Sequence, residues 1–352
     1  MKHTYFTVGP SQTYPTIPDH VKTAMDEEIV SLSHRSEQFK QLFKQTDESL
    51  KQLLNIPQDY SIFFFSSATE CWERILENCV FENSFHVISG AFSTKFYEAA
   101  LGMKKNAEKY QFDGLEFNLE TVSTDTELIA FTQNETSNGM MIPMEYIYKV
   151  RESNPDKLIA LDVVSSIPYV TIDFSKIDLT FFSLQKGFGL PAGLAVMIVS
   201  PAALEKAQEV EVSDNDLTTY RRFSSMKKYY DKQQTFETPN VFGIYLLNKV
   251  TQDMLQKGVE VIRQEIDQKA DLLYTFFKDT DNYSLANEHE EFRSKTVVVA
   301  NVPAGSTELL KRLQYEGFIL GAGYEALKDQ QIRIANFPTQ SVDDVKRLIS
   351  VL

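Results

Sequence analysis

Cysteine is scarce in this chain, because the 352 residues include only Cys71 and Cys79, both within an apolar segment. Two such thiols provide no disulfide framework, so we expect a reducing compartment and two small buried side chains. The first residues lack the apolar stretch and cleavage site of a signal peptide. No uninterrupted apolar run approaches the roughly 20 residues that span a bilayer. These absences predict a cytoplasmic protein that does not associate with membranes.

Positive charge is also scarce, with 35 Lys and Arg against 49 Asp and Glu and a formal net charge of −14. Nucleic-acid surfaces need clustered Lys and Arg, so this balance argues against a nucleic-acid partner. An anionic substrate would need local basic residues to overcome the overall negative field. The five histidines are scattered without the spacing of metal ligands, which predicts no metal site.

Continuously apolar stretches dominate the first two thirds of the chain. Such stretches are typical of strands buried on both faces of a mostly parallel sheet, whereas half-exposed antiparallel strands alternate. Helical or turn-rich segments separate them, which indicates an α/β domain with helices on both faces. The expected strands are 61–65, 86–89, 127–132, 157–162, 179–183 and 193–199.

The last third has its own pattern of elements. Thr238-Pro239-Asn240 opens a helical pattern that continues to about residue 278, and Pro suits the first turn of a helix. Strands at 296–300 and 332–335 follow, with helices at 306–315 and 341–351, the last with Ser341 as the expected N-cap. We expect a large domain over residues 15–250 and a smaller α/β domain formed by 1–14 and 251–352.

Two chemically suggestive residues stand at the ends of neighbouring strands. Asp162 ends one apolar stretch, and Lys186 follows the next. Ligands of open α/β sheets gather at the carboxyl ends of the strands, where both residues would lie. A carboxylate there can keep a pyridinium nitrogen protonated, and a lysine can form an imine with a cofactor aldehyde. On this pattern alone, two solvated residues at a sheet edge are the simpler interpretation.

Several longer motifs favour the chemical interpretation. Residues 183–193, Ser-Leu-Gln-Lys-Gly-Phe-Gly-Leu-Pro-Ala-Gly, resemble the cofactor-lysine loop of the class V aminotransferases, particularly of phosphoserine aminotransferase. Residues 162–166, Asp-Val-Val-Ser-Ser, are similar to that family's strand-end Asp with its Ser-Ser. Residues 132–139 are similar to its Asn-Glu-Thr-x-x-Gly loop. The resemblance extends over most of the chain.

This resemblance implies a pyridoxal-phosphate-dependent transferase of fold type I, whose large domain has a mostly parallel seven-stranded sheet. It implies that Lys186 carries pyridoxal 5′-phosphate (PLP) as an imine and acts as the catalytic base and acid. Asp162 would pair with the pyridine nitrogen, and Thr136 would donate a hydrogen bond to the phenolic oxygen.

Other cofactor contacts are expected around this centre. Small residues between a strand and a helix can cradle a phosphate with backbone N–H groups, which singles out Ala68 and Thr69, with Gln185 as a side-chain donor. Phe92 stands where the family has a tryptophan that stacks on the cofactor ring, and a phenylalanine can also stack. Thr238 looks like the threonine that reaches the phosphate across a dimer interface, which implies a homodimer with shared sites.

The substrate needs cations for its anionic groups. Arg333 stands where the family keeps the arginine that binds the α-carboxylate, and arginine suits this task because it can bind bidentately. His34 and Arg35 match a Ser-His-Arg motif that contacts the substrate phosphate from the neighbouring subunit. A second His-Arg pair, which many phosphoserine aminotransferases have shortly before the carboxylate arginine, is absent from residues 321–331. Lys328 could supply this missing charge.

The expected activity is ping-pong transamination of an amino acid and a 2-oxo acid. Phosphoserine with 2-oxoglutarate is the first pair, which would place the enzyme in serine biosynthesis. Because residues 323–328 look like the Gly-Tyr-x-x-Leu-Lys loop of the alanine– and serine–glyoxylate branch, a glyoxylate- or pyruvate-using aminotransferase is the alternative. A cysteine desulfurase is disfavoured because no cysteine follows residue 79, and a nicotinamide dehydrogenase because no G-x-G-x-x-G follows a first strand. A non-catalytic binding protein on the same fold is the remote alternative.

Overall fold

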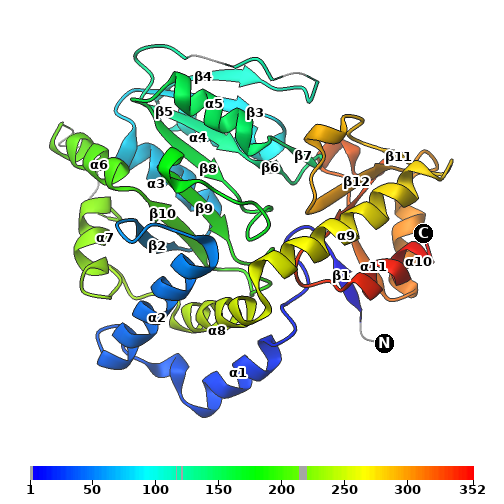
Figure 1. Cartoon of the computed structure of the whole chain (residues 1–352), viewed down its shortest axis with the longest axis horizontal. Coiled ribbons are helices and arrows are strands. Elements are labelled where there is room, and N and C mark those ends of the chain that lie inside the picture. Colours follow the sequence, from blue (N-terminus) through cyan, green and yellow to red (C-terminus); the bar gives the residue numbers. More distant parts are fainter. Residues whose placement is uncertain (1–2, 116, 120–121, 214–219) are drawn as a thin grey trace.

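The structure is a computed structural model that describes residues 3–115, 117–119, 122–213 and 220–352. A seven-stranded sheet forms its centre, in the spatial order β2-β10-β9-β8-β5-β3-β4 (Figure 1). Every neighbouring pair is parallel except the two that involve β10. The predicted α/β fold with a mostly parallel seven-stranded sheet is therefore confirmed. The strands are β2 (Ser61–Phe65), β3 (Asn83–Ile88), β4 (Asn106–Gln111), β5 (Leu128–Thr132), β8 (Leu158–Asp162), β9 (Leu179–Ser183) and β10 (Ala195–Val199).

Helices cover both faces of this sheet, which explains why its strands are continuously apolar. In β2, Ile62 and Phe64 pack into the cluster that contains α2 and α8, whereas Phe63 and Phe65 pack into the cluster that contains α3. Alternate side chains of a strand point to opposite faces, so both sets must be apolar when both faces are covered. The helices are α1 (Ile17–Asp26), α2 (Glu37–Leu54), α3 (Ala68–Cys79), α4 (Ala91–Gly102), α5 (Met144–Ser153), α6 (Pro201–Ser213), α7 (Phe223–Tyr230) and α8 (Val241–Lys257).

A second, five-stranded sheet lies beside the first, in the order β1-β13-β14-β12-β11 (Figure 1). Its first strand comes from the beginning of the chain and pairs in parallel with β13, so that Thr4 lies opposite Phe318. Apolar side chains of α9, α10 and α11 cover one face of this sheet. The elements are β1 (Thr4–Phe6), β11 (Ser284–Leu285), β12 (Val297–Asn301), β13 (Phe318–Ala322), β14 (Gln331–Ala335), α9 (Val259–Lys278), α10 (Ser306–Tyr315) and α11 (Val342–Ile349).

The long helix expected over 238–278 is wrong in two respects. Gly258 interrupts it with a φ of 89°, a left-handed conformation that glycine adopts without a steric penalty, and two helices result. The first helix begins only at Val241, with Asn240 as its N-cap accepting a hydrogen bond from the N–H of Gly243. Pro239 therefore precedes the helix. The expected boundary after residue 250 lies within α8, and the division into 15–250 and 1–14 with 251–352 stays a prediction.

The start of the C-terminal helix could be predicted from the local sequence alone. Ser341 is its N-cap, and its hydroxyl accepts a hydrogen bond from the N–H of Asp344 while the Asp344 carboxylate accepts one from the N–H of Ser341. The predicted cap is thus confirmed.

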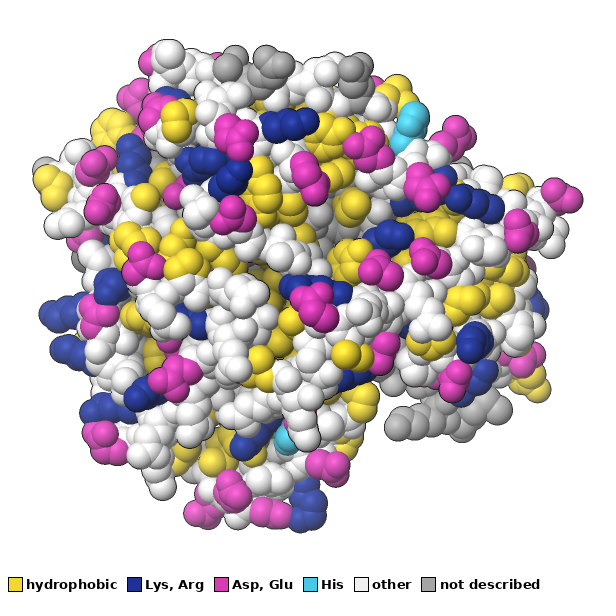
Figure 2. All heavy atoms as spheres, in the orientation of Figure 1, with side chains coloured by type: hydrophobic (Ala, Val, Ile, Leu, Met, Phe, Trp, Pro, Cys, Tyr) yellow, Lys and Arg dark blue, Asp and Glu magenta, His cyan; other side chains and the backbone are white. Residues whose placement is uncertain are grey.

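On the visible face in Figure 2, Lys and Arg side chains are interspersed with Asp and Glu. No helix among the described residues combines the length and apolar character needed to cross a membrane.

Candidate active site

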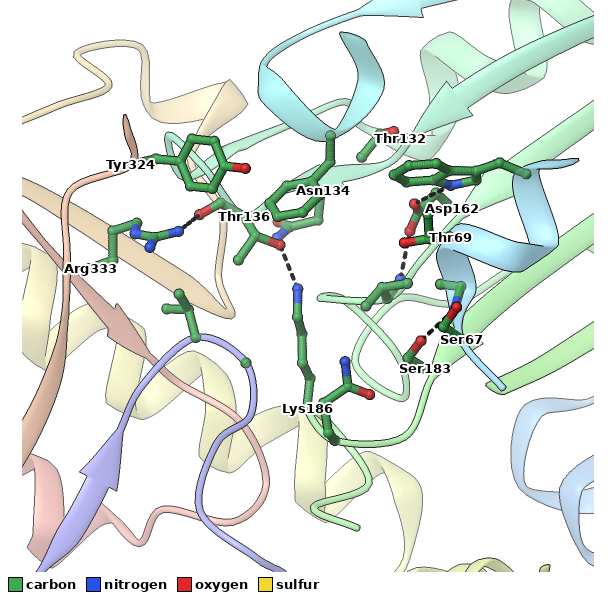
Figure 3. A pocket seen from close by; sticks show the side chains of 17 residues that line it. Ser67, Thr69, Thr132, Asn134, Thr136, Asp162, Ser183, Lys186, Tyr324 and Arg333 are labelled. Atoms are coloured by element: carbon green, nitrogen blue, oxygen red, sulfur yellow. Dashed lines mark hydrogen bonds between the residues drawn. The ribbon is translucent and has the colours of Figure 1, made fainter. Parts of the chain in front are cut away.

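A cavity of about 260 Å³ lies between the two sheets, at the carboxyl ends of β5, β8 and β9. This is many times the roughly 10–15 Å³ that a single water molecule occupies by the same kind of measure. In Figure 3, Lys186 rises between Asp162 and Thr69 on one side and Tyr324 and Arg333 on the other. The lining residues are Val8, Gly9, Ser67, Ala68, Thr69, Trp72, Phe92, Thr132, Asn134, Thr136, Asp162, Val164, Ser183, Gln185, Lys186, Tyr324 and Arg333.

Asp162 is the last residue of β8, and its carboxylate is buried at the base of the cavity. The backbone N–H of Val164 donates to its Oδ1 at 2.9 Å, and the indole N–H of Trp72 donates to its Oδ2 at 3.4 Å. Burial raises the pKa of Asp162 to about 6, although the Val164 N–H and the Lys186 ammonium oppose this shift. A buried carboxylate with only two donors can accept a further hydrogen bond from a protonated ring nitrogen.

Lys186 is equally buried, with only 7% of its surface exposed, and its Nζ donates to the Thr136 hydroxyl at 2.8 Å. Burial lowers the pKa of Lys186 to about 8; the carboxylates of Asp162 and Glu135 oppose the shift, and the cation of Arg333 favours it. Such an amine is partly unprotonated near neutral pH, as a nucleophile or general base requires.

The beginning of the chain covers this lysine. Gly9 has a φ of 140°, and a Cβ placed there would lie 2.7 Å from Cε of Lys186. The backbone next to it is tied to the lysine loop, because the N–H of Ser11 donates to the carbonyl of Gln185 at 3.0 Å. Sequence reasoning missed Gly9, since only the folded chain brings the two segments together.

The backbone of Phe92 is held by a buried carboxylate. Glu135 accepts hydrogen bonds from the backbone N–H groups of Phe92 and Ser93, at 3.0 and 3.1 Å, at the N-terminus of α4. This carboxylate satisfies helix-terminal donors that would otherwise lack partners. The contact fixes the start of α4, so the Phe92 ring faces the cavity with its centroid 5.5 Å from Nζ of Lys186.

The first turn of α3 lies at the wall of the cavity. Ser67 is the N-cap of this helix and accepts from the N–H of Glu70, and the N–H of Ala68 donates to the Ser183 hydroxyl at 2.7 Å. Ala68, Thr69 and Gln185 all line the cavity, as expected for a phosphate site.

Arg333 closes the opposite side. It lies on β14, and its Nε donates to the carbonyl of Ala322 at 2.7 Å while Nη1 donates to the carbonyl of Thr136 at 3.3 Å. Its guanidinium carbon lies 5.3 Å from the ring centroid of Tyr324. Partial burial lowers the pKa of Arg333. The guanidinium therefore sits fixed at the cavity wall, where it can receive a carboxylate.

Four expected residues do not line this cavity. These are His34, Arg35, Thr238 and Lys328. The guanidinium of Arg35, which follows His34 in the sequence, donates to the carbonyls of Thr235 and Phe236 at 2.8 and 3.1 Å. Thr238, two residues after Phe236, is exposed. Lys328 is exposed in a turn, and its carbonyl accepts from the hydroxyl of Ser306.

Lys95, which was not among the expected site residues, contacts the wall of the cavity. Nζ of Lys95 lies 2.6 Å from the hydroxyl of Tyr324, which lines the cavity. Sequence reasoning also missed Trp72 and Tyr324. The position of Trp72, one turn into the helix that follows the predicted phosphate loop, was an available signal. No cluster of metal-ligating side chains occurs within the described ranges.

Known proteins with this architecture were found by sequence and by structure. A phosphoserine aminotransferase of Corynebacterium glutamicum is 25% identical, covering 99% of this chain and 93% of its own. The crystal structure of a phosphoserine aminotransferase from Cytophaga hutchinsonii is 42% identical and superimposes with a TM-score of 0.97 over 99% of this chain and 98% of that one. An alanine–glyoxylate aminotransferase from Nostoc shares the fold, with a TM-score of 0.84 at 20% identity over 100% and 94% of the two chains.

The donor set of the cavity suits a phosphorylated pyridine aldehyde. The buried amine of Lys186 and the buried carboxylate of Asp162, which can accept a further hydrogen bond, both line the cavity. The N-terminus of α3 lies beside them. The hydroxyl of Thr132 is buried there, and no hydrogen-bond partner for it occurs in the described part of the chain. A family model described as aminotransferase class-V matches residues 6–347, which include every element of this cavity. The chain belongs to the class-V aminotransferases, and pyridoxal phosphate is its cofactor.

Proposed function

We propose that this protein is a phosphoserine aminotransferase that transfers an amino group between glutamate and 3-phosphohydroxypyruvate, forming phosphoserine and 2-oxoglutarate. The observation that carries the proposal is the match to the Cytophaga hutchinsonii protein of that name, at 42% identity over 99% of this chain. The reaction belongs to serine biosynthesis and takes place in the cytoplasm.

The chain's own residues have distinct tasks in this proposal. Bound pyridoxal phosphate supplies an electron sink for the bonds at the substrate's α-carbon. Lys186 holds the cofactor and, once free, moves the proton at the α-carbon, for which its lowered pKa suits it. Asp162 keeps the ring nitrogen protonated, Thr136 donates to the phenolic oxygen, and Arg333 binds the α-carboxylate.

Further cofactor contacts complete the proposed site. Phe92 would lie against the ring, and the N-terminus of α3 at Ala68 and Thr69, with the Gln185 amide, would bind the phosphate. Thr132 could donate its free hydroxyl within the same cavity.

The remaining site residues serve a neighbouring subunit. Arg35 and the 235–238 segment are joined by hydrogen bonds on one surface and do not line this chain's own cavity. In a homodimer with shared sites, His34 and Arg35 would reach the partner's substrate and Thr238 the partner's cofactor phosphate. This arrangement would give a role at the site to three polar residues that do not line this chain's own cavity.

A second candidate is a glyoxylate- or pyruvate-using aminotransferase that acts on alanine or serine. The observation that favours it is Tyr324, which stands in the cavity wall within a loop resembling that branch. The structural likeness to the Nostoc enzyme is a likeness of fold alone.

Single-turnover spectroscopy separates the two candidates. We expect the visible absorbance of the cofactor-loaded enzyme to decay much faster with phosphoserine than with alanine or serine at equal concentration. Faster decay with alanine or serine would refute phosphoserine as the substrate.

Borohydride fixation tests the cofactor lysine itself. Treatment of the loaded enzyme should attach the cofactor to the peptide that contains Lys186, whereas Lys186→Ala should bind cofactor without fixation. Attachment at another lysine would contradict the assignment.

A further inference from the structure

Lys95 contacts residues that line the cavity but has no role among the proposed cofactor contacts. Lys95 lies on α4, three residues after Phe92, so both side chains project from the same face of the helix. Its Nζ lies 5.8 Å from the Phe92 ring centroid, and Nζ of Lys186 lies 5.5 Å from that same centroid. Both ammonium groups therefore lie near the ring of Phe92, which lines the cavity.

Lys95 and Arg333 flank one aromatic ring. Nζ of Lys95 lies 5.2 Å from the ring centroid of Tyr324, and the guanidinium carbon of Arg333 lies 5.3 Å from it. Lys95 also meets the Tyr324 hydroxyl at 2.6 Å. Lys95 and Arg333 thus present two cations beside one tyrosine, as an amino acid with two anionic groups requires.

The present partners of Lys95 leave it available. Apart from Tyr324, it faces the carboxylate of Glu325 at 3.6 Å, and the two side chains are 44% and 68% exposed. Such an exposed ion pair contributes little, so an incoming dianion can displace the carboxylate. The contact with Tyr324 raises the pKa of Lys95, with Glu325 acting in the same direction, so the amine stays charged at neutral pH.

We propose that Lys95, with the Tyr324 hydroxyl, forms this chain's part of the subsite that receives the distal anionic group of the substrate: the phosphate of phosphoserine or the γ-carboxylate of glutamate. The inference rests on the proposed function. It assigns to Lys95, which contacts the lining residues Phe92 and Tyr324, the charge that sequence reasoning sought in Lys328. Neutral side chains, as in alanine, would leave this subsite unused, so the pair selects for acidic substrates.

Steady-state kinetics of Lys95→Met tests the subsite. Loss of one charge-assisted hydrogen bond should raise the KM for phosphoserine and for glutamate about tenfold, with a much smaller change for alanine. Lys109→Met is the matched control, because this exposed lysine also lies over a tyrosine ring, Tyr97 at 5.0 Å, but Tyr97 does not line the cavity whereas Tyr324 does. A rise in KM that is equal for acidic and neutral substrates would overturn the proposal.

Variants of the two partners should change the same constant in opposite directions. Glu325→Gln removes the competing carboxylate and should lower the KM for phosphoserine about two- to threefold. Tyr324→Phe keeps the ring but loses the hydroxyl, and should raise this KM about threefold. A Glu325→Gln enzyme with a higher KM for phosphoserine would contradict the assigned role of Lys95.

Chemical protection supplies a readout that does not need turnover. Phosphoserine should slow the acetylation of Lys95 at least several-fold more than alanine does, measured by mass spectrometry with Lys109 as the internal reference. Equal rates with both amino acids would overturn the subsite. Wild-type enzyme that turns over glutamate but not phosphoserine would refute the proposed function alone, and glutamate would then decide the role of Lys95 by the same kinetics and protection.

Discussion

Replacing Asp162 with Asn should lower the pKa of Lys186 below its wild-type value of about 8. Burial disfavours the charged lysine, and the carboxylate of Asp162 is the largest opposing influence. Since the pKa of Asp162 is about 6, this carboxylate is ionised where Lys186 titrates. Its removal leaves the burial effect less opposed, so the neutral amine becomes more favoured.

The expected magnitude follows from the wild-type shift. A fall from 10.5 to about 8 corresponds to roughly 3 kcal/mol against protonation. At pH 7 the neutral fraction of Lys186 is then roughly 300-fold larger than that of a free lysine. Asp162→Asn should enlarge it further and move the midpoint of reactivity to lower pH.

The assay is the rate at which an acylating reagent modifies Lys186 in cofactor-free protein, followed by mass spectrometry over a pH series. Wild-type reactivity should rise with a midpoint near 8, and the exposed Lys22 in the same digest corrects for reagent loss. The thermal unfolding midpoint identifies a variant that fails to fold. A midpoint for Asp162→Asn at or above the wild-type value would refute this electrostatic account.

Substitutions at three further positions test the site and the fold. Gly187→Ala should lower the thermal unfolding midpoint and cofactor affinity, because a Cβ there would lie 1.8 Å from the backbone oxygen of Ile167; an unchanged midpoint would contradict that contact. Arg333→Lys should raise the KM for every amino acid about tenfold by losing bidentate binding, with kinetics of alanine as the check that the loss is not specific to acidic substrates. Ser341→Ala should cost about 1 kcal/mol in denaturant unfolding, whereas Ser341→Asp should retain most of the cap.

The strands of the large sheet could be predicted because burial on both faces leaves a continuous apolar record in the sequence. The edge strand β4, Asn106–Gln111, could not be, since most of its side chains are exposed and polar. Helical periodicity also continues through Gly258, so it cannot indicate a break that depends on one residue's φ. Period and composition thus indicate buried elements better than edges and breaks.

The candidate site shows the same division. The proximity of Asp162 and Lys186 could be expected because the carboxyl ends of neighbouring parallel strands must meet, whereas their chemical roles were implied by the motif resemblance. Gly9 and Tyr324 reach the cavity from the second sheet, and no local pattern encodes how that sheet sits on the first. Lys95 follows Phe92 by three residues, but its significance depends on the contact with Tyr324.

The pairing of β1 with β13 also bears on how the protein is made. The first residues leave the ribosome long before Phe318 is synthesised. Thr4 therefore has no partner strand until residues up to Phe318 have emerged. Val8, Gly9 and Arg333 enter the cavity wall through that same late assembly. A nascent chain can therefore fold the large sheet early, yet its own cavity wall is formed only after β13 and β14 have been synthesised.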